Sequence, residues 1–237
     1  MPNSERLRQT QVDSELRPGA ENAVQTCLAV TAEDRVVLIA DEPTLEIAAA
    51  IHSELGEVGA PISAFVLEEH GSRPLGTLPQ AIGKALEDAT VSLMIVRPEP
   101  GELQARMAVM DTAIERGIRH AHMPGVDERM MVTGMRADYR KVARLQERIL
   151  ARITAQSVVR VRTPAGTDLE VTFTADHSWV CCDGLIKPGV WQNLPTGQLF
   201  TTPASAEGVF VGDGAIGEWF GIRYPCLLYT SPSPRDQ

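Results

Sequence analysis

The 237-residue sequence has a formal net charge of -9 and a pI near 5.1, which makes nucleic acids and anionic membranes poor candidates as partners. Residues 1–17 are polar and contain no apolar core of a signal peptide. No apolar run approaches the roughly 20 residues needed to span a bilayer, so we expect no membrane segment.

Short apolar runs alternate with segments of helical period in the first half of the chain. The expected strands are residues 36–40, 62–67, 91–96 and 118–123. The expected helices between them cover about 43–58, 78–89 and 103–116. Strands that are apolar on both faces and separated by helices are typical of a parallel sheet covered by helices. We therefore predict an α/β fold with a doubly wound, mainly parallel sheet and helices on both faces.

A long helix is predicted over residues 137–153, where the apolar side chains recur at helical spacing on one face. The other side of this helix carries five cations: Arg140, Lys141, Arg144, Arg148 and Arg152. Such a face is ordinarily solvated, and a surface for an anionic partner is the functional alternative.

The hydrophobic period changes from helical to two residues at about Ala155. Val159 and Val161 alternate with arginines, a Pro-Ala-Gly turn follows, and residues 169–173 alternate again, which predicts an antiparallel hairpin. We therefore assign residues 1–154 to an α/β N-terminal domain. Residues 155–225 are predicted to begin a truncated, β-rich domain of catalytic type.

The last twelve residues do not continue either pattern. Residues 226–237 read C-L-L-Y-T-S-P-S-P-R-D-Q, which resembles the translated end of a transposon adaptor used in sequencing libraries. We interpret them as a non-native tail and expect them to pack against nothing. A genuine Ser/Pro-rich terminus is the alternative on composition.

Few motifs in the chain indicate chemistry. Asp-Glu-Pro follows the first strand in place of a G-x-G-x-x-G turn, which disfavours a nicotinamide or flavin nucleotide. His120 and His122 are two residues apart in an expected strand, so both imidazoles could meet one metal ion, although two hydrogen-bonded or solvated histidines are the ordinary interpretation. The natural cysteines are odd in number, which does not indicate a disulfide framework and favours a reducing cytoplasm.

A series of motifs in the second half resembles a known family. It consists of P-G-V-W-Q-N-L-P-T-G-Q at 188–198, T-P at 202–203, E-G at 207–208 and G-D-G at 212–214. The first half adds M-P-G at 123–125 and G-M-R-A-D-Y at 134–139. Together they resemble the thermophilic-type metallo-aminopeptidases, the leucyl aminopeptidase or aminopeptidase T family, over nearly all of the natural chain.

The resemblance implies one candidate metal ligand in this chain. The residue after the N-L-P-x-G glycine is typically a glutamate in that family, where it binds a two-metal centre. Here it is Gln198, whose neutral amide oxygen is a weaker ligand for Zn²⁺ or Co²⁺. The family's other ligands and its catalytic residues would lie downstream of residue 237, so we expect an amino-terminal fragment that is inactive by itself.

The resemblance also implies the function of the full-length parent. It would be a cytoplasmic, homodimeric aminopeptidase that removes N-terminal residues from peptides and uses a divalent metal, Zn, Co or Mn. A related branch, the 2,5-dihydroxypyridine dioxygenases, shares the scaffold, lacks the glutamate and uses one Fe(II) on a small-molecule substrate. A non-catalytic member of the same fold is the third possibility, because a turn at N-L-P-T-G-Q is needed in all three.

Overall fold

The computed structural model describes residues 5–153, 157–212 and 226–230, the last of these as strand backbone only. The chain forms two compact units. The first unit comprises the residues up to 145 together with 182–198, and the second comprises 146–181 together with the residues from 199 onward. None of the helices in the described ranges combines the length and the apolar character needed to cross a membrane.

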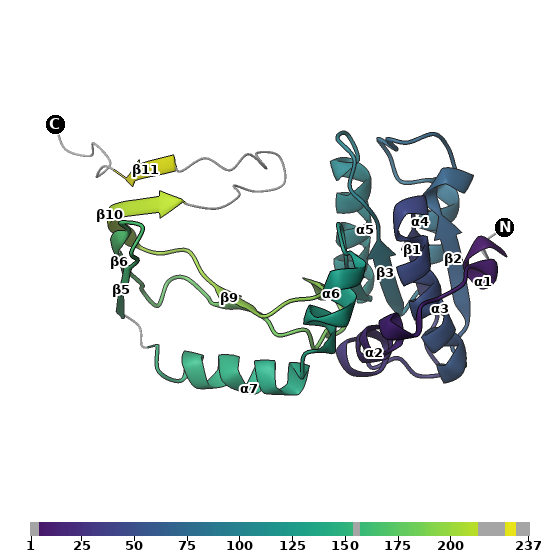
Figure 1. Ribbon diagram of the computed structural model, residues 1–237, viewed down its shortest axis with the longest axis horizontal. Coiled ribbons are helices and arrows are strands. Elements are labelled where there is room, and N and C mark those ends of the chain that lie inside the picture. The colour runs from purple at the N-terminus through teal and green to yellow at the C-terminus, as the bar shows by residue number, and fades with distance from the viewer. Residues whose placement is uncertain (1–4, 154–156, 213–225, 231–237) are drawn as a thin grey trace. The chain divides into compact units, whose positions relative to one another are not determined.

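The first unit contains a five-stranded sheet and most of the helices (Figure 1). Its strands are β1 (Val36–Ala40), β2 (Ile62–Val66), β3 (Val91–Ile95), β4 (Arg119–His122) and β8 (Trp191–Asn193). Its α-helices are α1 (Glu5–Gln9), α2 (Arg17–Glu21), α3 (Leu45–Val58), α4 (Gln80–Leu86), α5 (Leu103–Arg116) and α6 (Glu128–Val132). Shorter helical turns are η1 (Ser14–Leu16), η2 (Asn22–Cys27), η3 (Glu42–Thr44), η4 (Leu67–Glu69) and η5 (Gly134–Arg136). The helix α7 (Tyr139–Leu150) begins in the first unit and ends in the second.

The sheet confirms the predicted doubly wound α/β class. Its strand order is β2-β1-β3-β4-β8, and every neighbouring pair is parallel. The chain places β2 on one side of β1 and returns to place β3 on the other side, so the winding reverses between β1 and β3. In open α/β sheets this switch point, at the carboxyl ends of the strands, is where ligands most often bind.

Helices cover both faces of this sheet because β1 is apolar on both sides. Val36, Leu38 and Ala40 face a core that also contains apolar residues of α2, η2 and α3. Val37 and Ile39 face a second core, with apolar residues of α4 and α5. A strand buried in this way cannot alternate polar and apolar residues, which is why its sequence is a continuous apolar run.

Local sequence signals set the ends of the helices around the sheet. The Asp41 side chain caps η3 by accepting a hydrogen bond from the backbone of Thr44, and this turn leads directly into α3. Gly59 follows α3 and Gly117 follows α5, both with positive φ angles of 80° and 71°. A glycine adopts this left-handed conformation without steric cost, so both helices end where the glycines predict.

The fifth strand, β8, belongs to a segment that the sequence prediction assigned to the second domain. Residues 182–198 lie with the first unit, and the boundary predicted at 154/155 does not separate them from it. The physical reason is strand pairing, because β8 adds to the edge of the sheet in register with β4 and matches Ala121 with Gln192. A three-residue strand with polar residues has no sequence period that could indicate this pairing.

The second unit is β-rich, as predicted. It contains a four-stranded antiparallel sheet in the order β11-β10-β6-β5. These strands are β5 (Val158–Arg162), β6 (Asp168–Thr172), β10 (Ser205–Gly212) and β11 (Cys226–Thr230). A separate pair, β7 (Val180–Cys182) and β9 (Gln198–Phe200), crosses the sequence boundaries between the two units. The hairpin predicted from the two-residue period is the antiparallel pair β5 and β6.

The expectation that residues 226–237 pack against nothing is wrong for the first five of them. Residues 226–230 form β11, whose backbone pairs antiparallel with β10 from Gly208 to Gly212. Without β11, β10 would be the edge strand of its sheet, with N–H and C=O groups that any extended segment can pair, so the pairing requires no apolar period in the partner. Residues 231–237 lie outside the described residues, and the foreign origin of the tail stays a prediction.

Candidate functional site

The family-like motif N-L-P-T-G-Q is held at the edge of the sheet by β4. The backbone N–H of His120 donates to Val190 O at 3.2 Å, and that of Leu194 donates to His122 O at 3.0 Å. Leu194 is buried in the core of the first unit, and Pro195 packs closely on Gly134. A Cβ added to Gly134 would lie 2.9 Å from Pro195 Cβ, so this glycine allows the close approach. The motif thus begins on a rigid element.

Gln192, in the middle of β8, fixes the turn that leads into this segment. Its side chain is buried, and its Oε1 accepts a hydrogen bond of 2.7 Å from Gly184 N. Its Nε2 donates to Asp183 Oδ1 at 3.4 Å, and the same oxygen accepts from Leu185 N at 2.9 Å. A buried amide whose donor and acceptor are both used constrains the segment, so Gln192 is a positioning residue.

Gln198, the candidate metal ligand, begins β9 and its side chain is exposed. The structure therefore places it four residues beyond the buried Leu194 anchor, in the strand that pairs with β7. Among the described residues, no group of three or more His, Cys, Asp or Glu side chains is arranged to hold a metal ion. One neutral amide oxygen does not make a metal site, so the donor set of the described residues does not fit the implied metal centre.

The histidine pair on β4 does bring its two rings together, as the two-residue spacing predicts. His120 Nε2 lies 3.3 Å from His122 Nδ1, and His120 Nδ1 lies 2.8 Å from Ser92 Oγ. Both histidines are buried, and the His122 ring also contacts Trp191 with ring centroids 5.9 Å apart. The hydrogen bonds from Ser92 to His120 and from His120 to His122 can run in either direction, and each direction needs one proton on each imidazole. Both contacts are therefore made by neutral rings.

Burial keeps these imidazoles neutral. It lowers the pKa of His120 to about 3, with a further contribution from His122. It lowers the pKa of His122 to about 4, and the nearby Arg106 guanidinium acts in the same direction. The two nitrogens that could bind one metal ion, His120 Nε2 and His122 Nδ1, are already hydrogen-bonded to each other. The positive charge of the nearby Arg106 also disfavours a metal cation here. The pair therefore fits a buried hydrogen-bond chain better than a metal site.

A buried ion network lies at the switch point between β1 and β3, which the sequence did not indicate. Arg73 forms two hydrogen bonds to Glu102, from Nε at 2.8 Å and from Nη2 at 2.5 Å, and a third to Asp41. All three side chains are at most 5% exposed. Asp41 also accepts from Arg97 N at 2.6 Å, and Arg97 O accepts from Arg73 at 2.7 Å.

The network keeps the Glu102 carboxylate ionised. Burial opposes ionisation of Glu102, but the hydrogen bonds and charge of Arg73 outweigh it and lower the pKa of that carboxyl. Glu102 and Asp41 accept three of the five N–H donors of the guanidinium, and Arg97 O accepts a fourth. The network joins the loops that follow β1 and β3, so it has a structural role at the switch point.

Comparisons with known proteins support the fold only. No family model matches the sequence, and no curated protein is significantly similar to it. The solved structures that share the fold include the 2,5-dihydroxypyridine dioxygenase from Pseudomonas putida KT2440, with a TM-score of 0.56 and 20% identity, and wild-type AmpT from Thermus thermophilus, with a TM-score of 0.53 and 18% identity. They cover 84% and 83% of this chain, which spans 60% and 64% of theirs. The chain thus has an aminopeptidase-like fold that a dioxygenase shares.

Proposed function

We propose that the chain, with its α/β unit and its β-rich unit, belongs to a metal-dependent aminopeptidase-like hydrolase that removes N-terminal residues from peptides. The observation that carries the proposal is the fold likeness to AmpT over 83% of the chain, together with the N-L-P-T-G-Q segment held on β4. The metal, Zn, Co or Mn, would be held mainly by residues outside those described. The first unit would contribute rigid positioning of the segment that ends at Gln198.

The chemistry explains why Gln198 is the residue to test. Hydrolysis of a peptide by two metal ions needs carboxylate ligands that hold the ions close together, polarise the carbonyl and generate hydroxide. An amide at this position supplies an oxygen without charge, so the second ion is expected to bind weakly. A metal-dependent peptidase with this substitution should therefore be limited by occupancy of its second metal.

One observation favours a second candidate, a mononuclear iron dioxygenase acting on a small molecule. An iron site of two histidines and one carboxylate needs no bridging carboxylate, so a glutamine after the N-L-P-x-G glycine does not weaken it. The dioxygenase from Pseudomonas putida is as similar in fold to this chain as AmpT is.

The deciding experiment replaces Gln198→Glu in the full-length parent, with Gln25→Glu as the matched control at an exposed position on η2. Metal content and hydrolysis of a leucyl substrate are measured for each form. The proposal expects Gln198→Glu to tighten the second metal ion and to raise hydrolysis at limiting metal, whereas Gln25→Glu changes neither. One tightly bound iron and no hydrolysis by any form would eliminate the aminopeptidase and leave the dioxygenase.

A further inference from the structure

A cavity of about 600 Å³ opens within the first unit at the carboxyl ends of β1, β3 and β4, and we call it the switch-point cavity. Its walls come from the 42–47 segment after β1, from Arg97 after β3 and from residues 126–129 after β4. The carboxyl ends of parallel strands beside a switch point are the usual place for a ligand, and small-molecule sites have volumes of this order. The proposed function does not use this cavity.

Three charged side chains of the switch-point cavity are not engaged by the protein itself. In the part of the chain that the structure describes, no ion pair or side-chain hydrogen bond is found for Arg97, Glu128 or Arg129, and all three are exposed. The backbone of Arg97 is nevertheless fixed on both sides, because its N–H donates to Asp41 at 2.6 Å and its O accepts from Arg73 at 2.7 Å. The buried ion network thus holds Arg97 in place, which lowers the entropy cost of binding a ligand there.

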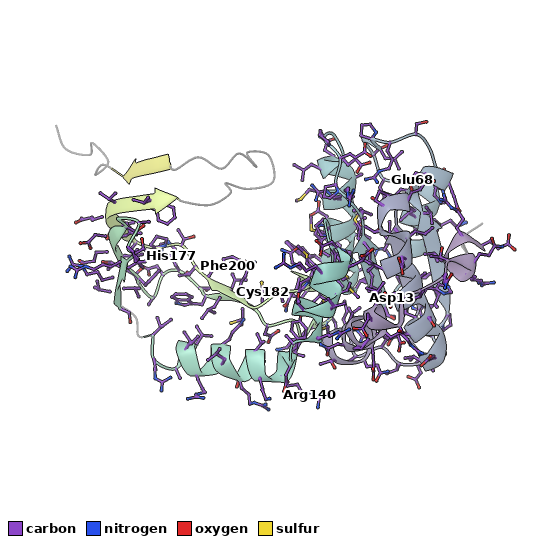
Figure 2. The ribbon with its side chains drawn as sticks, viewed as in Figure 1. Asp13, Glu68, Arg140, His177, Cys182 and Phe200 are labelled. Carbon is purple, nitrogen blue, oxygen red and sulfur yellow. The ribbon has the colours of Figure 1, made fainter. Side chains whose placement is uncertain are left out.

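The other carboxylates of the cavity already have partners. Glu42 pairs with Arg6 at 2.9 Å. Asp13 lies beside α3 (Figure 2), and its backbone N–H donates to Glu46 Oε1 at 2.9 Å. Asp127 caps α6 through its side chain. The charge that remains for a ligand is therefore two guanidinium groups and one carboxylate.

This charge pattern excludes two common kinds of ligand. A phosphate would need backbone donors at the helix start, but Glu42 N donates to Glu68 at 3.1 Å, Pro43 has no N–H and Thr44 N donates to Asp41 at 3.1 Å. The four carboxylates that line the cavity would also repel it. A divalent metal is disfavoured by the two guanidinium groups, and no cluster of three or more metal-binding side chains is found among the described residues.

We propose that the switch-point cavity binds a zwitterion, with the ligand's carboxylate on Arg97 and Arg129 and its α-ammonium group on Glu128. Guanidinium groups bind carboxylates through paired, charge-assisted hydrogen bonds, and an ammonium group donates up to three. A second hollow of about 350 Å³ shares Glu128 and Arg129 with the cavity, and Leu16 and Val132 give it an apolar wall for the ligand's side chain. A free amino acid and a short peptide both have this chemistry. The proposal uses first-unit residues only and holds whether or not the parent hydrolyses peptides.

The test measures binding to the 237-residue chain by isothermal titration calorimetry, with L-leucine, N-acetyl-L-leucine, L-leucinamide and L-leucyl-L-leucine as probes. Leucine should bind, whereas N-acetyl-leucine lacks the ammonium group and leucinamide lacks the carboxylate, so each should bind at least about tenfold more weakly. Tighter binding of the dipeptide than of leucine identifies a peptide as the ligand, and the reverse order identifies a free amino acid. The proposal is overturned if neither binds at millimolar concentration, or if a blocked form binds as well as leucine.

Two variants assign the ends of the ligand. Arg97→Gln should weaken leucine binding at least about tenfold but leave leucinamide binding unchanged, because leucinamide has no carboxylate to lose. Glu128→Gln should do the same for leucine and N-acetyl-leucine. Arg116→Gln and Glu33→Gln, at exposed charges outside the cavity, are the matched controls and should bind like the wild type. Equal losses for leucine and its blocked form, in variants whose circular dichroism shows them folded, would overturn the assignment.

Discussion

Mild acid is expected to destabilise the first unit through His120 and His122. In the unfolded chain an imidazole has a pKa near 6.5, whereas burial lowers the pKa of His120 to about 3 and that of His122 to about 4 in the folded protein. Between about pH 6.5 and pH 4 the unfolded chain therefore binds more protons than the folded one. Stability falls as the pH falls through this window, and the loss ends at the folded pKa values.

The magnitude follows from the linkage of proton binding to folding. Each pH unit below 6.5 costs about 1.4 kcal/mol per histidine, so a change from pH 7 to pH 5 costs about 2 kcal/mol for each ring. The two rings together should lower the free energy of unfolding by about 4 kcal/mol, a large part of the 5–15 kcal/mol typical of a domain. Burial acts to raise the pKa values of the Asp34 and Glu102 carboxyls, but their arginine partners outweigh burial and lower these pKa values. Their contribution to the free energy of unfolding is lost only below about pH 4.5, outside this window.

The assay is urea unfolding at pH 7 and pH 5, followed by far-UV circular dichroism. The double variant His120→Gln with His122→Gln removes both titrating groups while keeping hydrogen-bonding side chains, so its stability should change far less between the two pH values. His52→Gln is the matched control, because His52 is only partly buried and burial lowers its pKa to a lesser extent. Equal stability of the wild type at both pH values, or an unchanged pH dependence in the double variant, would refute the reasoning.

Two further substitutions test the buried polar groups. Arg73→Met leaves Asp41 and Glu102 as uncompensated buried charges and should lower the free energy of unfolding by about 3–5 kcal/mol. Arg6→Met, which breaks an exposed pair with Glu42, should cost at most about 1 kcal/mol, and equal costs in urea unfolding would contradict the argument. Gln192→Ala leaves the buried Gly184 N–H without its acceptor and should cost about 1–3 kcal/mol. Hydrogen exchange at Leu194 should then speed up, and an unchanged rate would show that Gln192 does not hold the segment.

The parallel strands were predictable because a strand that is buried on both faces has a continuous apolar sequence. Val36–Ala40 and Val91–Ile95 are continuous apolar runs, and glycines end the helices beside them. The strand β8 could not be predicted in this way, because Trp191–Asn193 is short and its pairing with β4 joins residues about seventy positions apart. Pairing of this kind depends on the register of the backbone at the sheet edge, and that register is not contained in any local period.

The sequence also predicted one of the two buried polar clusters in part and the other not at all. The two-residue period placed the His120 and His122 rings on one side of a strand, but it could not supply Ser92, which faces them from the neighbouring strand. Arg73 lies in a loop rich in glycine, serine and proline, and its partners Asp41 and Glu102 are 32 and 29 residues away. A buried ion pair requires only that tertiary packing bring its charges together, so sequence spacing could not reveal it.

Only part of the N-L-P-T-G-Q motif bears on chemistry, because Gln198 lies apart from the residues that anchor the motif. Leu194 and Pro195 are held by the first unit, where the backbone of β4 and the close packing on Gly134 explain them without any reaction. Gln198 lies past that anchor, exposed, at the start of β9. Any metal there must take its other ligands from groups that the described residues do not bring to this point. The first half of the motif is therefore a requirement of the fold, and the proposed activity rests on Gln198 and on the residues that face it.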